Sequence, residues 1–341
     1  MPRELAICLA TYRRPLMLSR LLGSLERAVI PEGTRVHLRI VDNDAKGSAR
    51  EVVERLRWEG EGRGELVYDI EPEQNIALTR NRAVERGPAD LVLFVDDDEV
   101  VPEDWLRAHL RVLDDSGADA VFGPVDGRLP AGAPLWLYDE AMFNKETGPD
   151  GTRLDWRDTR TSNTLVRGRW FYGAGYRFDP SFGRSGSSDT DLFKRMEEAG
   201  ASYVSADSAR VWEDVEPERA NLRWLLKRYY RNGLTFHRLQ GRGSSKAKEL
   251  ARFAARAARM LVGIAAHAPA FVLGRPGRLY RTLCSGALAW GGFVALRQPT
   301  AARSFVEYGK RAGAATPPAD PAACGSPDSK AQGSESSRRA S

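Results

Sequence analysis

Three consecutive aspartates, Asp96, Asp97 and Asp98, follow the apolar run LVLFV and are the side chains in this sequence best suited to hold a metal ion. Mg²⁺ and Mn²⁺ prefer carboxylate oxygens and can bridge from the protein to the phosphates of a substrate. Such an ion neutralises the charge that develops when a diphosphate leaves. An acidic turn after a strand would have the same composition, so the interpretation depends on where the triplet lies in the fold.

A second pair of carboxylates, Asp189 and Asp191, stands in the segment SGSSDTDLFKR at the start of a predicted helix. The helix dipole stabilises a negative charge at this end. An ionised carboxylate facing the metal site could remove a proton from an acceptor hydroxyl. Helix capping by Ser187 or Ser188 would explain the same pattern without any catalytic role.

A cluster of amides and one guanidinium occupies residues 74–81, QNIALTRN, where a strand is expected to pass into a helix. Arg80 in this cluster could bind a phosphate bidentately. A solvent-exposed arginine beside an asparagine helix cap explains the pattern equally well. The histidines show no spacing typical of metal ligands, and we assign no role to them: His37, His109, His237 and His267.

The elements that must position these groups alternate along the first hundred residues. Strands are predicted at 4–10, 36–42, 65–70 and 90–98, with helices at 15–25, 48–58 and 76–86. This alternation predicts an α/β fold with a mostly parallel sheet flanked by helices, and such sheets bind ligands at the carboxyl ends of their strands. Three polar clusters follow three of the strands, which indicates one nucleotide-type site: Thr11-Tyr12, Asp42-Asn43-Asp44 and Asp96-Asp97-Asp98.

The middle of the chain, residues 120–185, is rich in Gly, Pro and Trp and has a less regular pattern. Short strands are predicted at 119–125, 162–167 and 202–205, and a helix should follow Ser188. We expect acceptor specificity to reside in 125–185.

Charge is distributed unevenly. Residues 1–218 carry 29 Lys and Arg against 41 Asp and Glu, whereas residues 219–311 carry 19 basic residues and two acidic ones, Glu249 and Glu307. A basic segment of this kind favours an anionic partner, either a membrane surface or a nucleic acid. Arg-rich helices that are simply solvated are the alternative, and the imbalance argues against it.

Two apolar stretches, 260–274 and 282–296, lie in the basic segment. Each has 15 residues, fewer than the roughly 20 that span a bilayer. They predict an interfacial or re-entrant helical hairpin, with two core helices packed on the first domain as the alternative. We therefore divide the chain into a catalytic domain at 1–220, a basic amphipathic helical and membrane-associating segment at 221–311, and a disordered Pro- and Ser-rich tail at 312–341.

Composition excludes several classes of protein. With 341 residues, of which 42% are hydrophobic, the chain can build a sizeable core, and no apolar run is long enough for a confident transmembrane helix. The three cysteines, Cys8, Cys284 and Cys324, lie far apart, which excludes a disulfide scaffold and a zinc module. The N-terminal apolar stretch is interpreted as a strand, not a signal peptide, so we expect a reduced, cytoplasmic protein.

An ordered series of motifs over about residues 3–240 resembles a known family. The series is ATYRRP, VDND, PEQNIALTRNRAV, LFVDDDEVVPEDWL, GPV, NTLVRG, FDPSFGRSGSSDTDLFKRM and WEDVEPER. It is similar to family 2 glycosyltransferases of the GT-A fold, in the bacterial branch that makes succinoglycan and other exopolysaccharides. The resemblance implies a nucleotide-sugar donor, usually a UDP-sugar, a divalent cation (Mn²⁺ or Mg²⁺) and inversion of the anomeric centre in a single displacement.

The resemblance also implies a donor site. Thr11 and Tyr12 match the loop that contacts nucleobase and ribose, and Asp42 matches the aspartate that hydrogen-bonds uracil. Arg80 and Asn81 match an Arg-Asn pair beside the donor. In the aspartate triplet, which matches a DxD motif, Asp96 would hold the ribose or sugar, Asp97 would line the donor site, and Asp98 would be the metal ligand.

By the same resemblance Asp189 is the general base and Asp191 the acidic position that follows it. Two departures stand out. The family's usual Glu before the base is Ser188 here, and its third metal ligand, a His about 24 residues after the base, is absent. Glu213 stands at that distance and could replace it as a metal ligand, or it could pair with Arg219.

Together these observations predict a peripheral enzyme at the cytoplasmic face of the membrane that extends a glycan or lipid-linked acceptor. The same chemistry on a soluble metabolite or protein acceptor is one alternative, and a non-catalytic sugar-nucleotide-binding protein is another. A nucleic-acid binder that uses 219–260 with Trp224, Tyr229 and Tyr230 is a third. The adjacent apolar stretches favour a membrane, so no nucleic-acid partner is expected.

Overall fold

The computed structural model describes residues 1–240 and 246–297. The described residues belong to one compact unit. The predicted tail at 312–341 and the end of the basic segment at 298–311 lie outside the described residues. The domain boundary at residue 220 stays a prediction.

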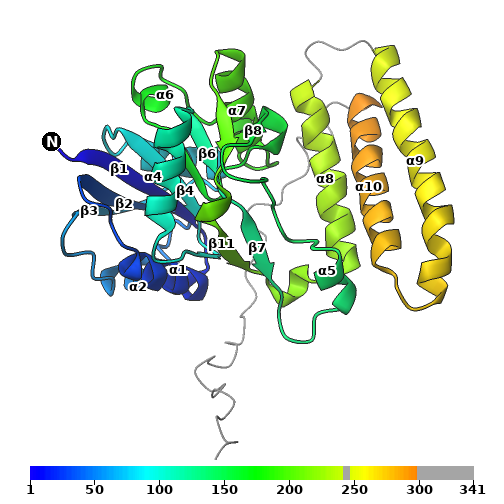
Figure 1. Ribbon diagram of the computed structural model, residues 1–341, viewed down its shortest axis with the longest axis horizontal. Coiled ribbons are helices and arrows are strands. Elements are labelled where there is room, and N and C mark those ends of the chain that lie inside the picture. The colour runs from blue at the N-terminus through cyan, green and yellow to red at the C-terminus, as the bar shows by residue number, and fades with distance from the viewer. Residues whose placement is uncertain (241–245, 298–341) are drawn as a thin grey trace, which may run out of the picture. The chain divides into compact units, whose positions relative to one another are not determined.

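A large mixed sheet forms the core of the first part of the chain (Figure 1). Its strands run in the order β3-β2-β1-β4-β9-β6-β10-β8. The first four pair in parallel, while β9 is antiparallel to both β4 and β6. The strands are β1 (Arg3–Thr11), β2 (Thr34–Asp42), β3 (Arg63–Ile70), β4 (Leu91–Asp96), β6 (Ala120–Phe122), β8 (Arg153–Leu154), β9 (Thr164–Arg167) and β10 (Tyr203–Ser205). This architecture confirms the predicted α/β class.

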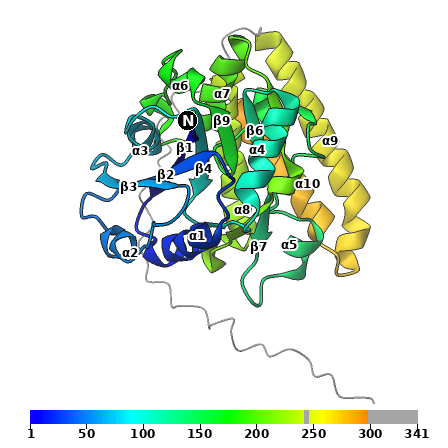
Figure 2. The ribbon, with the colours of Figure 1, turned by 60° about the vertical axis from the view of Figure 1, so that its left-hand side comes forward.

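Helices cover both faces of the sheet. Figure 2 shows α1 and α3 on opposite sides of β1 and β2. Leu5, Ile7 and Leu9 of β1 pack in one core cluster with α1, α2 and α4, whereas Ala6 and Cys8 pack in another with α3, α6 and α7. Side chains alternate between the faces of a strand, so a strand buried on both faces is apolar throughout. The helices are α1 (Pro15–Arg27), α2 (Arg50–Glu54), α3 (Ile76–Val84), α4 (Trp105–Ser116), α6 (Arg169–Tyr172) and α7 (Ser188–Glu198).

A second, three-stranded sheet was not predicted. It has the order β5-β11-β7, from β5 (Glu99–Val100), β11 (Val211–Asp214) and β7 (Val125–Arg128). The strand predicted at 119–125 is divided between β6 and β7 at Gly123-Pro124. Proline has no N–H for a sheet, and a Cβ on Gly123 would lie 2.2 Å from Asn163 Nδ2. The division places β7 and β11 beside the aspartate triplet.

Three helices follow the sheet: α8 (Leu222–Gln240), α9 (Lys246–Val272) and α10 (Gly277–Arg297). Figure 1 shows α10 between the other two, and it packs against both. Its contact with α8 is close, because a Cβ on Gly233 would lie 2.0 Å from Leu288 O and one on Gly291 equally near Tyr230 O. Both apolar stretches are thus helical, as predicted. None of the helices in the described ranges combines the length and the hydropathy that crossing a bilayer requires.

Candidate functional site

The predicted polar clusters meet at the carboxyl ends of adjacent strands. Thr11 and Asp42, the last residues of β1 and β2, are register partners, and Asp96 at the end of β4 is the partner of Ala10. The parallel sheet therefore brings the three clusters to one edge. Asp97 and Asp98 follow in the turn after β4, because the strand ends at Asp96 rather than at 98 as predicted.

The loop after β1 connects these clusters. Thr11 donates a hydrogen bond from Oγ1 to Asp97 Oδ2 (2.8 Å), and Tyr12 accepts one from Gln74. Arg13 pairs with Asp44 at 3.0 Å and lies over the Tyr12 ring at 5.0 Å. Arg13 has φ of 52°, a left-handed conformation that is uncommon for a non-glycine residue. Thr11 and Tyr12 are therefore held by Asp97 and Gln74, and contact of these two residues with a nucleotide stays a prediction.

Asp42 is fully buried and organises the loop after β2. Its Oδ1 accepts from the Asp44 backbone N–H (2.9 Å), and its Oδ2 accepts from the Ala49 N–H (2.7 Å) and from the Tyr68 hydroxyl (3.1 Å). Burial and the charge of Asp42 raise the pKa of Tyr68, so this hydroxyl stays a donor. Both carboxylate oxygens are thus engaged by the chain itself, and a contact of Asp42 with uracil stays a prediction.

Helix α3 begins at a strong cap. Asn75 Oδ1 accepts from the Ala77 and Leu78 N–H groups at 3.1 and 3.3 Å. The helix directs Arg80 to Asp96 (3.5 Å) and over the Phe178 ring (5.7 Å). The exposed-arginine alternative is wrong, because only 14% of the Arg80 side chain is exposed.

Asn81 faces a different partner. Its amide exchanges two hydrogen bonds, both 2.8 Å, with the Phe178 backbone N–H and C=O. It therefore fixes the residue on which Arg80 packs, and direct contact with a donor stays a prediction.

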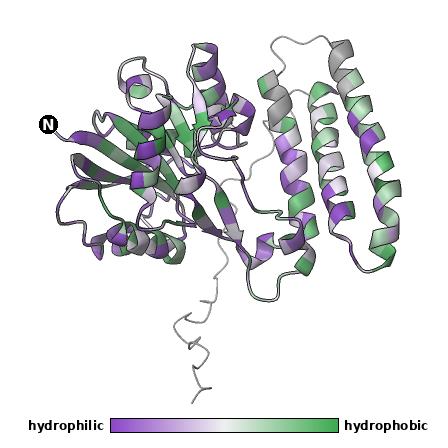
Figure 3. Ribbon diagram, viewed as in Figure 1, coloured by the Kyte–Doolittle hydropathy of each residue, from purple (hydrophilic) through white to green (hydrophobic). Residues whose placement is uncertain are grey.

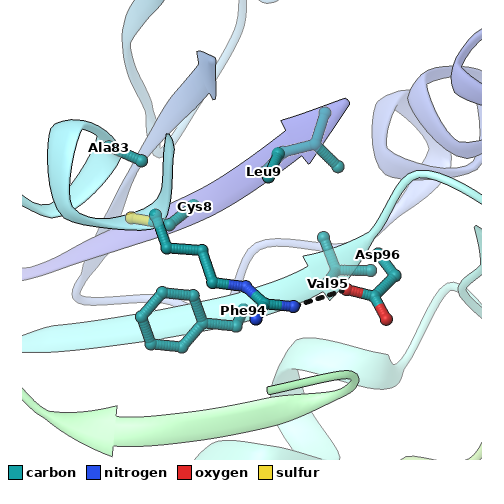
Figure 4. A pocket seen from close by; sticks show the side chains of 8 residues that line it. Cys8, Leu9, Ala83, Phe94, Val95 and Asp96 are labelled. Carbon is teal, nitrogen blue, oxygen red and sulfur yellow. Dashed lines mark ion pairs between the residues drawn. The ribbon is translucent and has the colours of Figure 1, made fainter. Parts of the chain in front are cut away.

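A small cavity of about 10 Å³ lies behind the Arg80–Asp96 pair, lined also by Cys8 and Phe94 (Figure 4). It has room for a single water molecule at most. Burial raises the pKa of the Cys8 thiol to about 12, which makes this thiol unreactive. The cavity is a packing defect and not a substrate pocket.

Arginines neutralise the second and third aspartates of the triplet. Arg14 Nη1 lies 3.0 Å from Asp97 Oδ1 and 3.1 Å from Asp98 Oδ2, while its Nη2 lies 3.3 Å from Glu216. Arg219 Nη1 approaches the same oxygen of Asp98 at 3.3 Å. Burial, together with the charges of Glu213 and Asp97, raises the pKa of Asp98 to about 7 despite these arginines.

Glu213 lies in β11 rather than in a loop, and both its carboxylate oxygens are engaged. Arg219 Nη2 lies 2.8 Å from Oε1, and Lys145 Nζ lies 2.7 Å from Oε2. Burial opposes ionisation, but these two cations prevail and hold the pKa of Glu213 well below its usual range. The pairing with Arg219 considered in the sequence analysis is present, and metal ligation by Glu213 stays a prediction.

The side chains at this edge of the sheet suit a metal ion that takes one ligand from the protein. Within the described parts of the chain, no group of three or more His, Cys, Asp or Glu side chains is arranged to hold an ion. Asp98 Oδ2 accepts from two arginines, and in the same residues no hydrogen bond reaches Asp98 Oδ1. A diphosphate would have to supply most of the other ligands, and Glu213 could join only by releasing Lys145 or Arg219.

Asp189 lies in the first turn of α7, half-buried, with Oδ1 accepting from the adjacent Thr190 N–H at 2.8 Å. Ser187 makes no side-chain cap there and instead bonds Thr235 of α8 at 3.0 Å, so the capping alternative does not explain Ser187. Burial lowers the pKa of Arg160, whereas the charges of Glu99, Asp189 and Asp96 raise it. Asp189 and Asp96 thus both act electrostatically on Arg160, and the role of Asp189 as general base stays a prediction.

Asp191 points elsewhere. It pairs with Arg195 one turn along α7, at 2.9 Å. This i,i+4 pair gives Asp191 a structural partner, and a catalytic role for Asp191 stays a prediction.

Two cations of this site, Arg14 and Lys145, were not predicted from the sequence. Arg14 stands in the ATYRRP motif, two residues after Tyr12, and could have been found from that position. Lys145 lies in the irregular middle segment, where no pattern distinguishes it from a surface lysine.

Comparisons with known proteins agree with this geometry. The family model "Glycosyl transferase family 2" matches residues 6–181. The chain is 38% identical over 236 residues to "Succinoglycan biosynthesis protein ExoM" of Rhizobium meliloti (strain 1021), which covers 69% of this chain and 74% of that protein.

A solved structure shares the fold at low sequence identity. The mannosyltransferase PcManGT from Pyrobaculum calidifontis, in complex with GDP-Man and Mn²⁺, matches with a TM-score of 0.58 and 18% identity, over 87% of this chain and 88% of that one. Residues 1–349 of S. aureus TarS in complex with UDP match with a TM-score of 0.49 and 16% identity, over 87% and 92%. The match to a longer TarS structure covers 39% of that chain. The matched model spans more than half of the sequence, and the chain therefore belongs to glycosyltransferase family 2, with the GT-A fold.

Proposed function

We propose that this glycosyltransferase moves a sugar from a UDP-sugar to a hydroxyl of a glycan or lipid-linked acceptor, with inversion, in exopolysaccharide or cell-surface glycan synthesis. The observation that carries the proposal is the meeting of Thr11, Asp42 and the aspartate triplet at adjacent strand ends, the edge at which sheets of this kind bind their ligands. The similarity to a protein named for succinoglycan biosynthesis supports the pathway class.

The donor lies across this edge of the sheet. Thr11, Tyr12 and Asp42 contact the nucleoside, with Asp42 also holding the loop that walls it. Asp96 and Asp97 bind ribose or sugar hydroxyls, and Arg80 stands beside them with its guanidinium over Phe178. On donor binding, Arg80 can exchange its 3.5 Å contact with Asp96 for a phosphate oxygen, because guanidinium groups pair well with both anions.

The chemical step is a single displacement. The acceptor hydroxyl oxygen forms a bond to the anomeric carbon from the face opposite the diphosphate, and the bond from that carbon to the diphosphate oxygen breaks. Asp189 takes the acceptor proton, and the nucleoside diphosphate leaves with the bonding electron pair. General-base assistance of this kind contributes about 10²–10⁴-fold to the rate.

A divalent cation, Mn²⁺ or Mg²⁺, supplies charge neutralisation for the leaving diphosphate when bound. Asp98 would hold it through its free Oδ1. Arg14 and Arg219, which already contact Asp98 Oδ2, keep this buried carboxylate in place and add positive charge at the same edge. The mannosyltransferase solved with Mn²⁺ supports a metal in this fold.

The acceptor lies at the inner face of the membrane in this proposal. The basic helical segment after residue 220 supports it, since each Lys or Arg near an anionic lipid surface contributes about 1 kcal/mol. A soluble metabolite or protein acceptor, with α8–α10 as a packing module, is the competing possibility. Transfer to a water-soluble acceptor without lipid would favour it.

A donor panel tests the proposal. The protein is incubated with UDP-glucose, UDP-galactose, UDP-N-acetylglucosamine, UDP-glucuronate and GDP-mannose, with Mn²⁺ or EDTA, and released nucleoside diphosphate is measured with and without membrane lipid extract. We expect one UDP-sugar to turn over, more with lipid and with metal, and not in Asp189→Asn. The proposal is wrong if no donor is bound or hydrolysed under any condition, because a non-catalytic relative would then be the better description.

A further inference from the structure

Large apolar side chains are exposed where α9 turns into α10. Val272 and Leu273 are 82% and 79% exposed. Phe271 beside them is half exposed, and Leu135 and Tyr138 of α5 (Leu135–Asp139) are exposed as well. Figure 3 shows the end of α9 at this turn in hydrophobic colours. We call these five residues the turn patch: Leu135, Tyr138, Phe271, Val272 and Leu273.

The outer face of α9 continues the turn patch. Residues 261–273, LVGIAAHAPAFVL, contain no Lys, Arg, Asp or Glu, and Leu261 and Val262 are 64% and 69% exposed. A helix of this length extends about 20 Å, shorter than the roughly 30 Å hydrocarbon core of a bilayer. An exposed apolar face of this size marks an interaction site, and one too short to span suits a membrane interface.

Basic side chains border the apolar surface. Arg275 and Arg278 are exposed in and after the turn, and Arg256 and Arg259 are exposed on α9 before the apolar stretch. The acids nearby are Asp139 and Glu140, and Glu140 is paired with Arg281 at 3.2 Å. Residues 246–297 carry nine Lys and Arg against one acid, Glu249. Apolar side chains within a cationic border complement an anionic lipid surface rather than a second copy of the same cationic face.

The turn patch is tied to the catalytic domain. Trp136 of α5 meets Tyr280 of α10 edge to face at 4.9 Å, and Tyr280 meets Phe271 at 6.2 Å. The chain then leaves α5 and within six residues reaches Lys145, which pairs with Glu213 at the aspartate triplet. A short stretch of chain therefore joins α5 to a residue of the site.

We propose that the turn patch and the outer face of α9 insert together into the surface of an anionic phospholipid bilayer. This insertion is more specific than a general attraction of the basic segment to anionic lipid, because α5 of the catalytic domain forms part of the contact. It fixes how the enzyme is oriented, with the exposed side of α5, Leu135 and Tyr138, against the lipid. It extends the proposed function but does not depend on it, since the binding needs neither donor nor transfer.

Vesicle co-sedimentation of the full chain tests the proposal. Vesicles contain phosphatidylcholine alone or equal parts of phosphatidylcholine and phosphatidylglycerol. We expect binding to the anionic vesicles, and a loss of about tenfold or more in Val272→Asp/Leu273→Asp, because two inserted side chains become charged. We expect Leu135→Asp to weaken binding to the anionic vesicles as well. Arg275→Gln/Arg278→Gln costs about fivefold per arginine on anionic vesicles only.

Val29→Asp is the matched control, since Val29 is 43% exposed after α1 and lies outside the surface. It binds vesicles like the unsubstituted protein. Circular dichroism and donor hydrolysis without lipid show that the α9 variant is folded and active. If no sugar donor is turned over but the protein still binds vesicles, the result counts against the proposed function and not against the docking proposal.

Two outcomes overturn the docking proposal. One is binding to anionic vesicles that the aspartate variants leave unchanged. The other is no vesicle binding at all, with a dimer in light scattering that the same variants convert to monomer, because the apolar surface would then be a self-association face.

Discussion

Lys145 Nζ lies 2.7 Å from Glu213 Oε2, and Arg219 joins the other oxygen of the same glutamate to Asp98. Glu213, for which the sequence suggested metal ligation, is thus the centre of a buried ion-pair network. The network presents two cations beside the aspartate triplet, where a diphosphate is expected. Its geometry links β11 of the small sheet to the turn after β4 of the large one.

Replacing Lys145 by methionine should destabilise the protein by about 3 kcal/mol, because Glu213 would keep a buried charge with one partner fewer. Chemical denaturation measures this loss. Arg20→Met is the control, since Arg20 pairs with the neighbouring Asp214 at the surface and its loss should cost less than about 1 kcal/mol. Equal losses in the two variants would show that the buried pair has no special role. In Lys145→Met/Glu213→Gln the stability should partly return.

Asp189→Asn should lower turnover by about 10²–10⁴-fold, because it removes the proposed base while keeping the shape of the side chain. Asp191→Asn is its matched partner, two residues along the same helix. That change removes the 2.9 Å pair with Arg195 and should cost less than about tenfold in rate and about 0.5 kcal/mol in stability. Steady-state rates with a saturating donor measure both. If Asp191→Asn were the more damaging change, the base would be Asp191.

Arg14→Gln should make the protein depend on divalent cations for stability. Arg14 contacts Asp97, Asp98 and Glu216, and without it these carboxylates repel one another. Mn²⁺ or Mg²⁺ should therefore raise the melting temperature of the variant more than that of the unsubstituted protein, as thermal unfolding with metal or EDTA would show. Arg20→Gln serves as the surface control. An identical response of variant and parent would argue that no ion reaches Asp98.

His109 should make folding sensitive to mild acid. It is fully buried, donates to Asn163 at 2.8 Å, and its pKa is lowered by burial from 6.5 to about 4. Between pH 6.5 and 4 the His109 side chain is protonated in the unfolded chain but stays neutral in the folded chain. Stability therefore falls as the pH is lowered through this window, by at most about 1.4 kcal/mol per pH unit.

The test for His109 is the difference between two denaturation series. His109→Gln retains a donor for Asn163 and has no titrating ring, so its stability should vary less between pH 7 and pH 4.5 than that of the parent. Parallel curves for parent and His109→Gln would mean that the depressed pKa is absent.

The predicted elements of the catalytic half came from local patterns and are largely confirmed. The four strands and the helices α1, α3 and α7 have apolar residues at strand or helix spacing. This spacing is required wherever a strand or helix buries a face, whatever the rest of the fold. The helix predicted at 48–58 is shorter, Arg50–Glu54. The second sheet escaped prediction because β5 has two residues and β11 four, too few for a period to appear.

The ion pairs of the site and the burial of the C-terminal helices were not predictable from the sequence, because both depend on contacts between residues far apart in the chain. The sequence placed Asp42, Asp96 and Asp98 at strand ends, because parallel strands carry their carboxyl ends to one edge wherever they lie in the order. It could not reveal that Lys145 and Glu213, far apart in the chain, become partners, since that requires β11 to lie beside β5 and β7. The sequence also could not show which of the two apolar helices, α9 or α10, would be covered by its neighbours. The glycines at 233 and 291 let α10 pack closely on α8 and leave α9 with an open apolar face, and close packing of this kind exists only once the helices meet.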